Sequence, residues 1–213
     1  ATECRVDYFV IDGSNVLGNE LNHLIQLVKQ HTSIPIILFP GSHYHIDGNA
    51  DAIFFLNFLS SRNPDLLAGN QIMAAPVLKK SSMEVMATGY LMINDQEICF
   101  ENTLSNNTPI SFSNTSLAAA TAIAAGMMGQ QLLFLDAGIY ASRPLPSKVL
   151  NAVRKASSLP MIIHGGLNSP EQVKLVLNQG MDMALINQDQ AMDTDYLIKV
   201  SEYVQLLNNK NVV

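Results

Sequence analysis

Short apolar segments alternate with longer segments that have helical spacing along most of the chain. An apolar run too short for a helix, closed by polar or glycine-containing turn residues, is typical of a buried strand. Apolar residues three or four positions apart indicate an amphipathic helix. Strands are expected at 6–11, 34–39, 52–56, 83–93, 131–136, 160–164 and 182–187. Helices are expected at 17–31, 65–75, 116–128, 146–156, 169–179 and 194–208.

This alternation predicts an α/β fold built from βα units. Such units form a parallel sheet, and strands buried on both faces read as nearly continuous apolar runs. We find no linker and no internal repeat that would divide the chain, so residues 1–213 are interpreted as one domain. A TIM-type barrel is favoured over an open sheet.

Composition narrows the classes of function. The net charge of −6 argues against a nucleic-acid-binding protein, which normally carries a basic stripe. No run of 18 apolar residues is present, so no membrane-spanning helix is predicted, and a cytoplasmic location is the default expectation. With 48% hydrophobic and only 14% charged residues, the chain is also expected to cover apolar surface by forming a homo-oligomer.

Candidate chemistry lies where two late strands end. Asp136 ends one apolar run and could orient a substrate hydroxyl or act as a base, although a solvated or helix-capping Asp has the same pattern. Gly165 and Gly166 end another run and could let backbone N–H groups approach a phosphate, or could simply form a tight turn. His164 beside them could contact phosphate or exchange protons, or could be a structural histidine of the strand.

The first expected strand also ends in polar residues. Ser14 could supply an oxygen to Mg²⁺ or phosphate, although an ordinary βα turn is the favoured explanation of Asp12-Gly13-Ser14. His43 and His45 are two residues apart in a loop, but a metal site would need a third ligand nearby. A surface loop is therefore the interpretation preferred for them.

Several segments together carry a family resemblance. They occur in the same order and spacing as in the geranylgeranylglyceryl phosphate synthase family, and especially resemble its bacterial, heptaprenylglyceryl phosphate synthase-like branch. The match extends over nearly the whole chain. The segments are Ile37-Leu38-Phe39-Pro40-Gly41-Ser42, Ala50-Asp51-Ala52-Ile53, Ser61-Arg62-Asn63-Pro64, Thr88-Gly89-Tyr90, Leu135-Asp136-Ala137-Gly138, Pro144, Pro146 and His164-Gly165-Gly166.

The resemblance implies a modified (βα)8 barrel and a prenyltransferase. The implied reaction joins a polyprenyl diphosphate to the 3-hydroxyl of sn-glycerol 1-phosphate, with Mg²⁺ as cofactor, in ether-lipid synthesis. The glycerol phosphate would lie on the rim formed by the late strands, and the prenyl tail would lie in an apolar groove along the barrel. Family members form dimers and hexamers, and the lipid product implies transient contact with a membrane.

The resemblance also assigns roles to individual positions. Asp136 falls where the family has a Glu that grips the glycerol hydroxyl, and is expected to be catalytic. Ser14 falls on a Mg²⁺-ligand hydroxyl, and Asp12 stands where the family has Gly and could act as a second ligand. Positions expected to bind the glycerol phosphate are Phe134, Leu135, Ala137, Gly138, His164, Gly165, Gly166, Asn187 and Gln188.

The chain departs from the family pattern at its start. The family has an initial strand ending in an Asp-Pro-Asp-Lys turn with a Mg²⁺ carboxylate and a phosphate-binding Lys, and no such turn occurs in this sequence. Two explanations are open: residues that precede Ala1 in the native protein are missing from this sequence, or the chain is a diverged member that lacks the first βα unit. A barrel without that unit would expose two strand edges. Two alternatives to the synthase follow: a non-catalytic homologue that binds phosphate or prenyl ligands or serves only in assembly, and another phosphate-binding barrel enzyme such as an isomerase.

Overall fold

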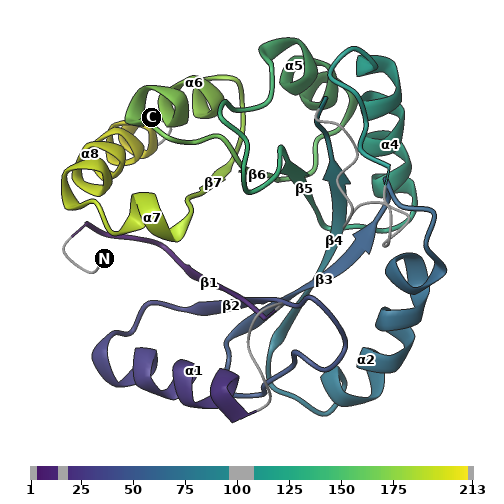
Figure 1. The fold of residues 1–213 in the computed structure, drawn as a ribbon, viewed down its shortest axis with the longest axis vertical. Coiled ribbons are helices and arrows are strands. Elements are labelled where there is room, and N and C mark those ends of the chain that lie inside the picture. The colour runs from purple at the N-terminus through teal and green to yellow at the C-terminus, as the bar shows by residue number, and fades with distance from the viewer. Residues whose placement is uncertain (1–3, 14–18, 96–107, 211–213) are drawn as a thin grey trace.

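Seven parallel strands form one curled sheet in which the strand order follows the chain order. The computed structural model describes residues 4–13, 19–95 and 108–210. The strands curl into a barrel-like wall with helices on its outside, and β1 and β7 flank the open sector (Figure 1). The strands are β1 (Phe9–Asp12), β2 (Ile36–Phe39), β3 (Ala52–Phe58), β4 (Glu84–Met92), β5 (Leu132–Asp136), β6 (Met161–His164) and β7 (Met183–Leu185).

Helices follow most strands and return the chain to the opposite end of the sheet. They are α1 (Asn19–His31), the π-helix η1 (Asp65–Gly69), α2 (Asn70–Leu78), α4 (Thr115–Met127), α5 (Ser147–Ala156), α6 (Pro170–Asn178), α7 (Gln188–Ala191) and α8 (Thr194–Lys210). Among these described helices, none is both long enough and apolar enough to cross a bilayer.

The predicted modified TIM-type barrel is confirmed. The described part of the chain contains seven strands, in agreement with the expected lack of one βα unit. Residues 83–93, predicted as one or two strands, form the single strand β4. The predicted helix at 65–75 begins with the π-helix η1, whose π form was not predicted. The four-residue helix α7 was not predicted, because it is too short to show a periodic pattern.

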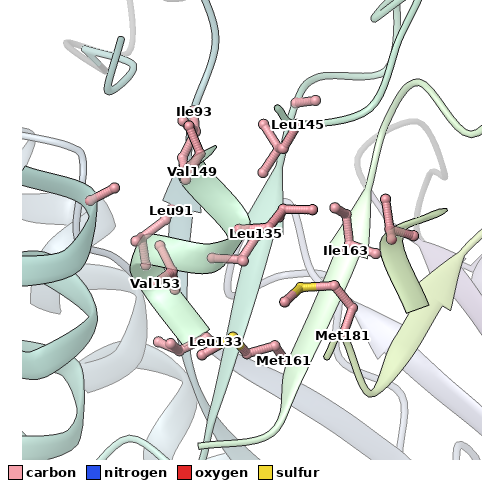
Figure 2. Close-up of a cluster of buried hydrophobic side chains, with 14 of the residues drawn as sticks. Leu91, Ile93, Leu133, Leu135, Leu145, Val149, Val153, Met161, Ile163 and Met181 are labelled. Carbon is pink, nitrogen blue, oxygen red and sulfur yellow. The ribbon is translucent and has the colours of Figure 1, made fainter. Parts of the chain in front are cut away.

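Side chains of the strands alternate between two cores. One set faces the helices, where Leu133 and Leu135 of β5 pack with Val149 and Val153 of α5 (Figure 2). The other set faces the barrel interior, where Tyr90, Phe134 and neighbouring aromatic rings meet. A strand buried on both faces explains the continuous apolar runs in the sequence.

Candidate functional site

Polar side chains converge where β4, β5, β6 and β7 end. In the parallel register, Met92 is opposite Asp136, Asp136 is opposite His164, and His164 is opposite Leu185. Each partner therefore lies at the same level of the barrel. Carboxyl ends of barrel strands are where TIM-type enzymes place their functional groups.

Asp136 is the centre of this cluster, and only 7% of the residue is exposed. Its Oδ2 accepts a hydrogen bond from the Tyr90 hydroxyl. Its Oδ1 accepts from the backbone N–H of Gly138 at 2.7 Å and lies 2.9 Å from Nδ1 of His164. A carboxylate has about four acceptor positions, so one remains after these three bonds.

His164 joins Asp136 to the end of the next strand. Its Nδ1 lies 2.9 Å from Asp136 Oδ1, and its Nε2 lies 2.7 Å from Oδ1 of Asn187. Both ring nitrogens face oxygen atoms, so the protonated ring can donate on both sides, which favours the imidazolium form. Burial alone lowers the pKa of His164, but the hydrogen bond and charge of Asp136, the bond to Asn187 and the charge of Asp12 outweigh it and raise the pKa.

An aromatic layer supports this polar layer from inside the barrel. The Phe134 ring stacks against Tyr90 with centroids 5.5 Å apart and lies 6.0 Å from the His164 ring. Phe134 is fully buried, so its side chain forms the floor of the site and is not open to a ligand in this structure. Burial, followed by the Asp136 carboxylate, raises the pKa of Tyr90 well above its usual value, which keeps the phenol protonated as the donor to Asp136.

Gly165 and Gly166 are explained first by packing. Both have positive φ values, +87° and +70°. A Cβ on Gly165 would lie 2.6 Å from the Gly138 carbonyl oxygen, and one on Gly166 would lie 2.1 Å from the backbone of Arg143. The pair therefore lets the loop after β5 approach the loop after β6, which is the tight-turn explanation; phosphate binding by these glycines stays a prediction.

The remaining predicted positions separate into two groups. Leu135 and Ala137 are buried in the helix-facing core, because side chains alternate along β5 and its continuation. Their side chains therefore do not line the site, and substrate binding through their backbone stays a prediction. Asn187 lies at the rim, and its Nδ2 also contacts the Ile139 carbonyl at 3.4 Å. Gln188 is exposed at the first position of α7. Ser14 lies outside the described residues.

The predicted metal site is only partly visible. Asp12 ends β1 and its carboxylate is close enough to act electrostatically on His164. Within the ranges described by the structure, no three His, Cys, Asp or Glu side chains are grouped to hold a metal ion. His43 and His45 lie in the loop between β2 and β3, where His43 interacts with Asn70, 3.0 Å away, and His45 packs against Gly13.

A narrow cavity opens beside the barrel wall. The β2–β3 pairing ends at Leu38 and Ile53, while β3 continues to Phe58, and the cavity lies beyond the end of that pairing, between β3 and α2. Its volume is about 40 Å³. Phe54 lines it and also contacts Phe134, so the aromatic layer connects the cavity to the polar cluster. The apolar part of its lining is Pro40, Ile46, Ile53, Phe54, Phe55, Leu56, Phe58, Leu66, Ala74 and Leu78.

Two residues of these sites were not predicted to be functional. Tyr90 belongs to the Thr88-Gly89-Tyr90 segment. Side chains two residues apart on a strand share a face, so Tyr90 lies on the interior face of β4 together with Met92. Gln71 lines the cavity and donates through Nε2 to the carbonyl groups of Leu56 and Leu66. No local sequence signal distinguishes Gln71 from an ordinary helix residue.

Comparisons with known proteins find relatives that match most of this chain. The model of the PcrB family matches residues 1–199. A geranylgeranylglyceryl phosphate synthase from Spirosoma linguale is 37% identical over 97% of this chain and 83% of its own. The synthase of the same name from Pyrococcus furiosus is 35% identical over 85% of this chain and 72% of its own.

The fold is also found among solved structures. A crystal structure of (S)-3-O-geranylgeranylglyceryl phosphate synthase from Thermoplasma acidophilum, in complex with its substrate sn-glycerol-1-phosphate, superposes with a TM-score of 0.87. The match covers 95% of this chain and 83% of the Thermoplasma acidophilum chain, at 25% sequence identity. The synthase from Thermoplasma volcanium, at 24% identity and a TM-score of 0.86, has the same fold.

Proposed function

Because this chain belongs to the PcrB family, we propose that it is a prenyltransferase that joins a polyprenyl diphosphate to the 3-hydroxyl of sn-glycerol 1-phosphate. The observation that carries the proposal is the 37% identity to a geranylgeranylglyceryl phosphate synthase over 97% of the chain. The related Thermoplasma acidophilum enzyme, which binds sn-glycerol-1-phosphate, has the same fold and supports the acceptor.

The acceptor half of the reaction is assigned to the strand-end cluster. Asp136 has one acceptor position left after its bonds to Tyr90, His164 and Gly138, and that position would receive the attacking hydroxyl. Holding the hydroxyl in one orientation lowers the entropic part of the barrier. The C–O bond to the diphosphate breaks, the new ether C–O bond forms, and the hydroxyl proton is released.

The phosphate of the acceptor is assigned to the neighbouring rim. His164 lies at the mouth of the barrel between Asp136 and Asn187, and Gly165 and Gly166 leave the backbone of the β6 loop without side chains. A backbone without side chains lets its N–H groups approach a phosphate dianion closely. Asn187 and Gln188 follow β7 at the same rim.

The prenyl tail is assigned to the cavity between β3 and α2. Its lining is mostly apolar, and Phe54 connects it through Phe134 to the acceptor site. The volume of about 40 Å³ is below the roughly 300–1,000 Å³ of typical ligand pockets. Entry of a polyprenyl chain therefore requires α2 to move outward, and how far it moves would set the chain length.

Mg²⁺ is proposed as the cofactor. Mg²⁺ is commonly held by one or two carboxylates together with substrate phosphates, so a single Asp12 at the end of β1 fits this ion without a protein cage. When bound, Mg²⁺ would neutralise the departing diphosphate. The protein would contribute the Asp12 carboxylate, at the same rim of the barrel as Asp136.

A homo-oligomer is also proposed, through helix α4. Its sequence from Thr115 to Met127 carries no charged residue, and Leu117, Ile123, Met127 and Met128 are exposed. An uncharged face of this kind marks an interaction surface. Met127→Glu should lower the mass measured by light scattering, whereas Lys148→Glu on α5 should not; an unchanged mass for both would overturn this assignment.

The decisive experiment uses the intact protein. It is incubated with radiolabelled sn-glycerol 1-phosphate, Mg²⁺ and a series of prenyl diphosphates of different lengths, and the organic extract is counted. We expect a prenylated product in the organic extract, and its yield across the series gives the chain-length preference. No label should appear in water-soluble isomers of the substrate. Absence of extractable product with every prenyl diphosphate would overturn the proposal, and a phosphate-binding homologue without turnover would then be favoured.

A further inference from the structure

The Asn187 side chain does not cap helix α7, although the residue occupies the N-cap position. It is the residue before α7, where Asn often caps the first turn by accepting a backbone hydrogen bond. Here the side chain makes no capping bond, and its backbone is extended. The amide is instead turned towards the barrel mouth, with Oδ1 2.7 Å from His164 Nε2 and Nδ2 3.4 Å from the Ile139 carbonyl oxygen.

Two neighbours distinguish the ends of this amide. The Ile139 carbonyl is an acceptor, so the NH₂ group faces it, and the amide oxygen is left facing His164 Nε2, which can donate to it. The orientation of the histidine ring is in turn fixed by Asp136, which lies 2.9 Å from Nδ1. Asp136, His164 and Asn187 thus form a chain in which each member orients the next.

The NH₂ group of Asn187 has two hydrogens, and the long contact with Ile139 occupies at most one. The other can donate to a ligand at the rim where β6 and β7 end, which is the rim assigned above to the phosphate. An amide N–H at this point can donate to a phosphate oxygen, which an amide oxygen would repel.

We propose that His164 is a positioning residue that orients the Asn187 amide so that its NH₂ group donates to the phosphate of the acceptor substrate. This inference rests on the proposed function for the identity of that substrate. It assigns binding of the phosphate to Asn187 and the control of amide orientation to His164. Asp136 serves both the hydroxyl and the orientation of the ring.

The test is a double-mutant cycle on substrate binding. Binding of sn-glycerol 1-phosphate is measured by calorimetry without prenyl diphosphate, for the wild type, His164→Leu, Asn187→Ala and the double variant. We expect each single substitution to weaken binding about five- to tenfold, the size of one lost charge-assisted hydrogen bond. The double variant should be no weaker than the single ones, because both remove the same interaction.

A conservative variant and a remote control separate positioning from general damage. His164→Gln keeps an N–H donor and should restore most of the affinity, whereas His31→Gln, on the exposed face of α1, should have no effect. The KM for the prenyl diphosphate should not change in any variant. Additive losses in the cycle, or no recovery in His164→Gln, would overturn the inference.

The outcome is separable from that of the proposed function. If the wild type binds sn-glycerol 1-phosphate with coupled residues but forms no ether, the inference stands and the proposed function fails. If the wild type forms the ether but His164 and Asn187 act independently, the proposed function stands and the inference fails.

Discussion

Asp136 Oδ1 lies 2.9 Å from His164 Nδ1, and both side chains are largely buried, with 10% and 14% of their surfaces exposed. The two residues are also direct partners in the β5–β6 register. A carboxylate and an imidazolium at this distance stabilise each other only as long as both keep their charge. The pair therefore links the stability of the barrel mouth to pH.

The first prediction is a loss of stability above neutral pH. The pKa of His164 is raised above its usual value of about 6.5, so the folded state holds the proton more tightly than the unfolded state. The contribution of the pair is complete below about pH 6.5 and is lost as the pH rises through the raised pKa. Urea unfolding of the wild type should show this decline, and His164→Gln should lack it; equal slopes for both proteins would contradict it.

The second prediction concerns Tyr90, which donates to Asp136 from β4. Tyr90→Phe should lower the free energy of unfolding by about 1–3 kcal/mol, because it leaves a buried carboxylate oxygen without its donor. It should also lower kcat, since Asp136 loses one of the bonds that hold its orientation. Tyr203→Phe is the matched control, because its hydroxyl binds Asn178 at an exposed site and should change stability by less than about 0.5 kcal/mol.

A result in which the two Tyr→Phe variants are equally stable would show that the Tyr90 bond is weak. Retained kcat with reduced stability would show that Tyr90 supports the fold without positioning Asp136.

The third prediction separates the glycines of the site from an ordinary turn glycine. Gly129 has φ +83° and open space around it, so Gly129→Ala should cost only the left-handed conformation, about 1–2 kcal/mol. Gly166→Ala adds a collision with the backbone of Arg143 and Pro144, which has no flexible side chain to yield. It should cost more than about 4 kcal/mol in urea unfolding, or prevent recovery of folded protein. Equal costs would mean that the 143–144 backbone moves away easily.

Most of the barrel could be predicted because its strands are buried on both faces and end in recognisable turns. The strand-end positions of Asp136 and His164 also follow from the sequence, since parallel strands bring their carboxyl ends together. The resemblance assigns Leu135 and Ala137 to the site without fixing the direction of their side chains, which point into the helix-facing core. With a two-residue period, Phe134 and Asp136 face the interior and Leu135 must face the helices.

The partners of Asp136 could not be predicted from local patterns. Tyr90 is 46 residues away, and its contact depends on the exact β4–β5 register. The bond between His164 and Asn187 likewise depends on β6–β7 pairing, which the apolar pattern leaves open by a residue or two. The helix over 65–75 beside the cavity was predicted, but the π-helical form of its first turn, η1, has no periodic signature of its own.

The fourth prediction tests the cavity as the prenyl site by filling it. Ala74 is buried on the inner face of α2 and lines the cavity, whereas Ala75, the next residue, is exposed on the outer face. Ala74→Phe should place a ring in the space proposed for the tail and raise the KM for a long prenyl diphosphate by about tenfold or more. The KM for sn-glycerol 1-phosphate should stay unchanged, because the ring lies in the cavity and not at Asp136.

Ala75→Phe is the matched control, with the same added volume on the other side of the helix, and should leave both KM values unchanged. The length series sharpens the result. A ring that shortens the usable cavity should harm long prenyl diphosphates more than short ones, whereas general overpacking of α2 would harm all lengths equally and lower the midpoint of thermal unfolding. A uniform loss across the series would therefore place the prenyl tail elsewhere on the barrel.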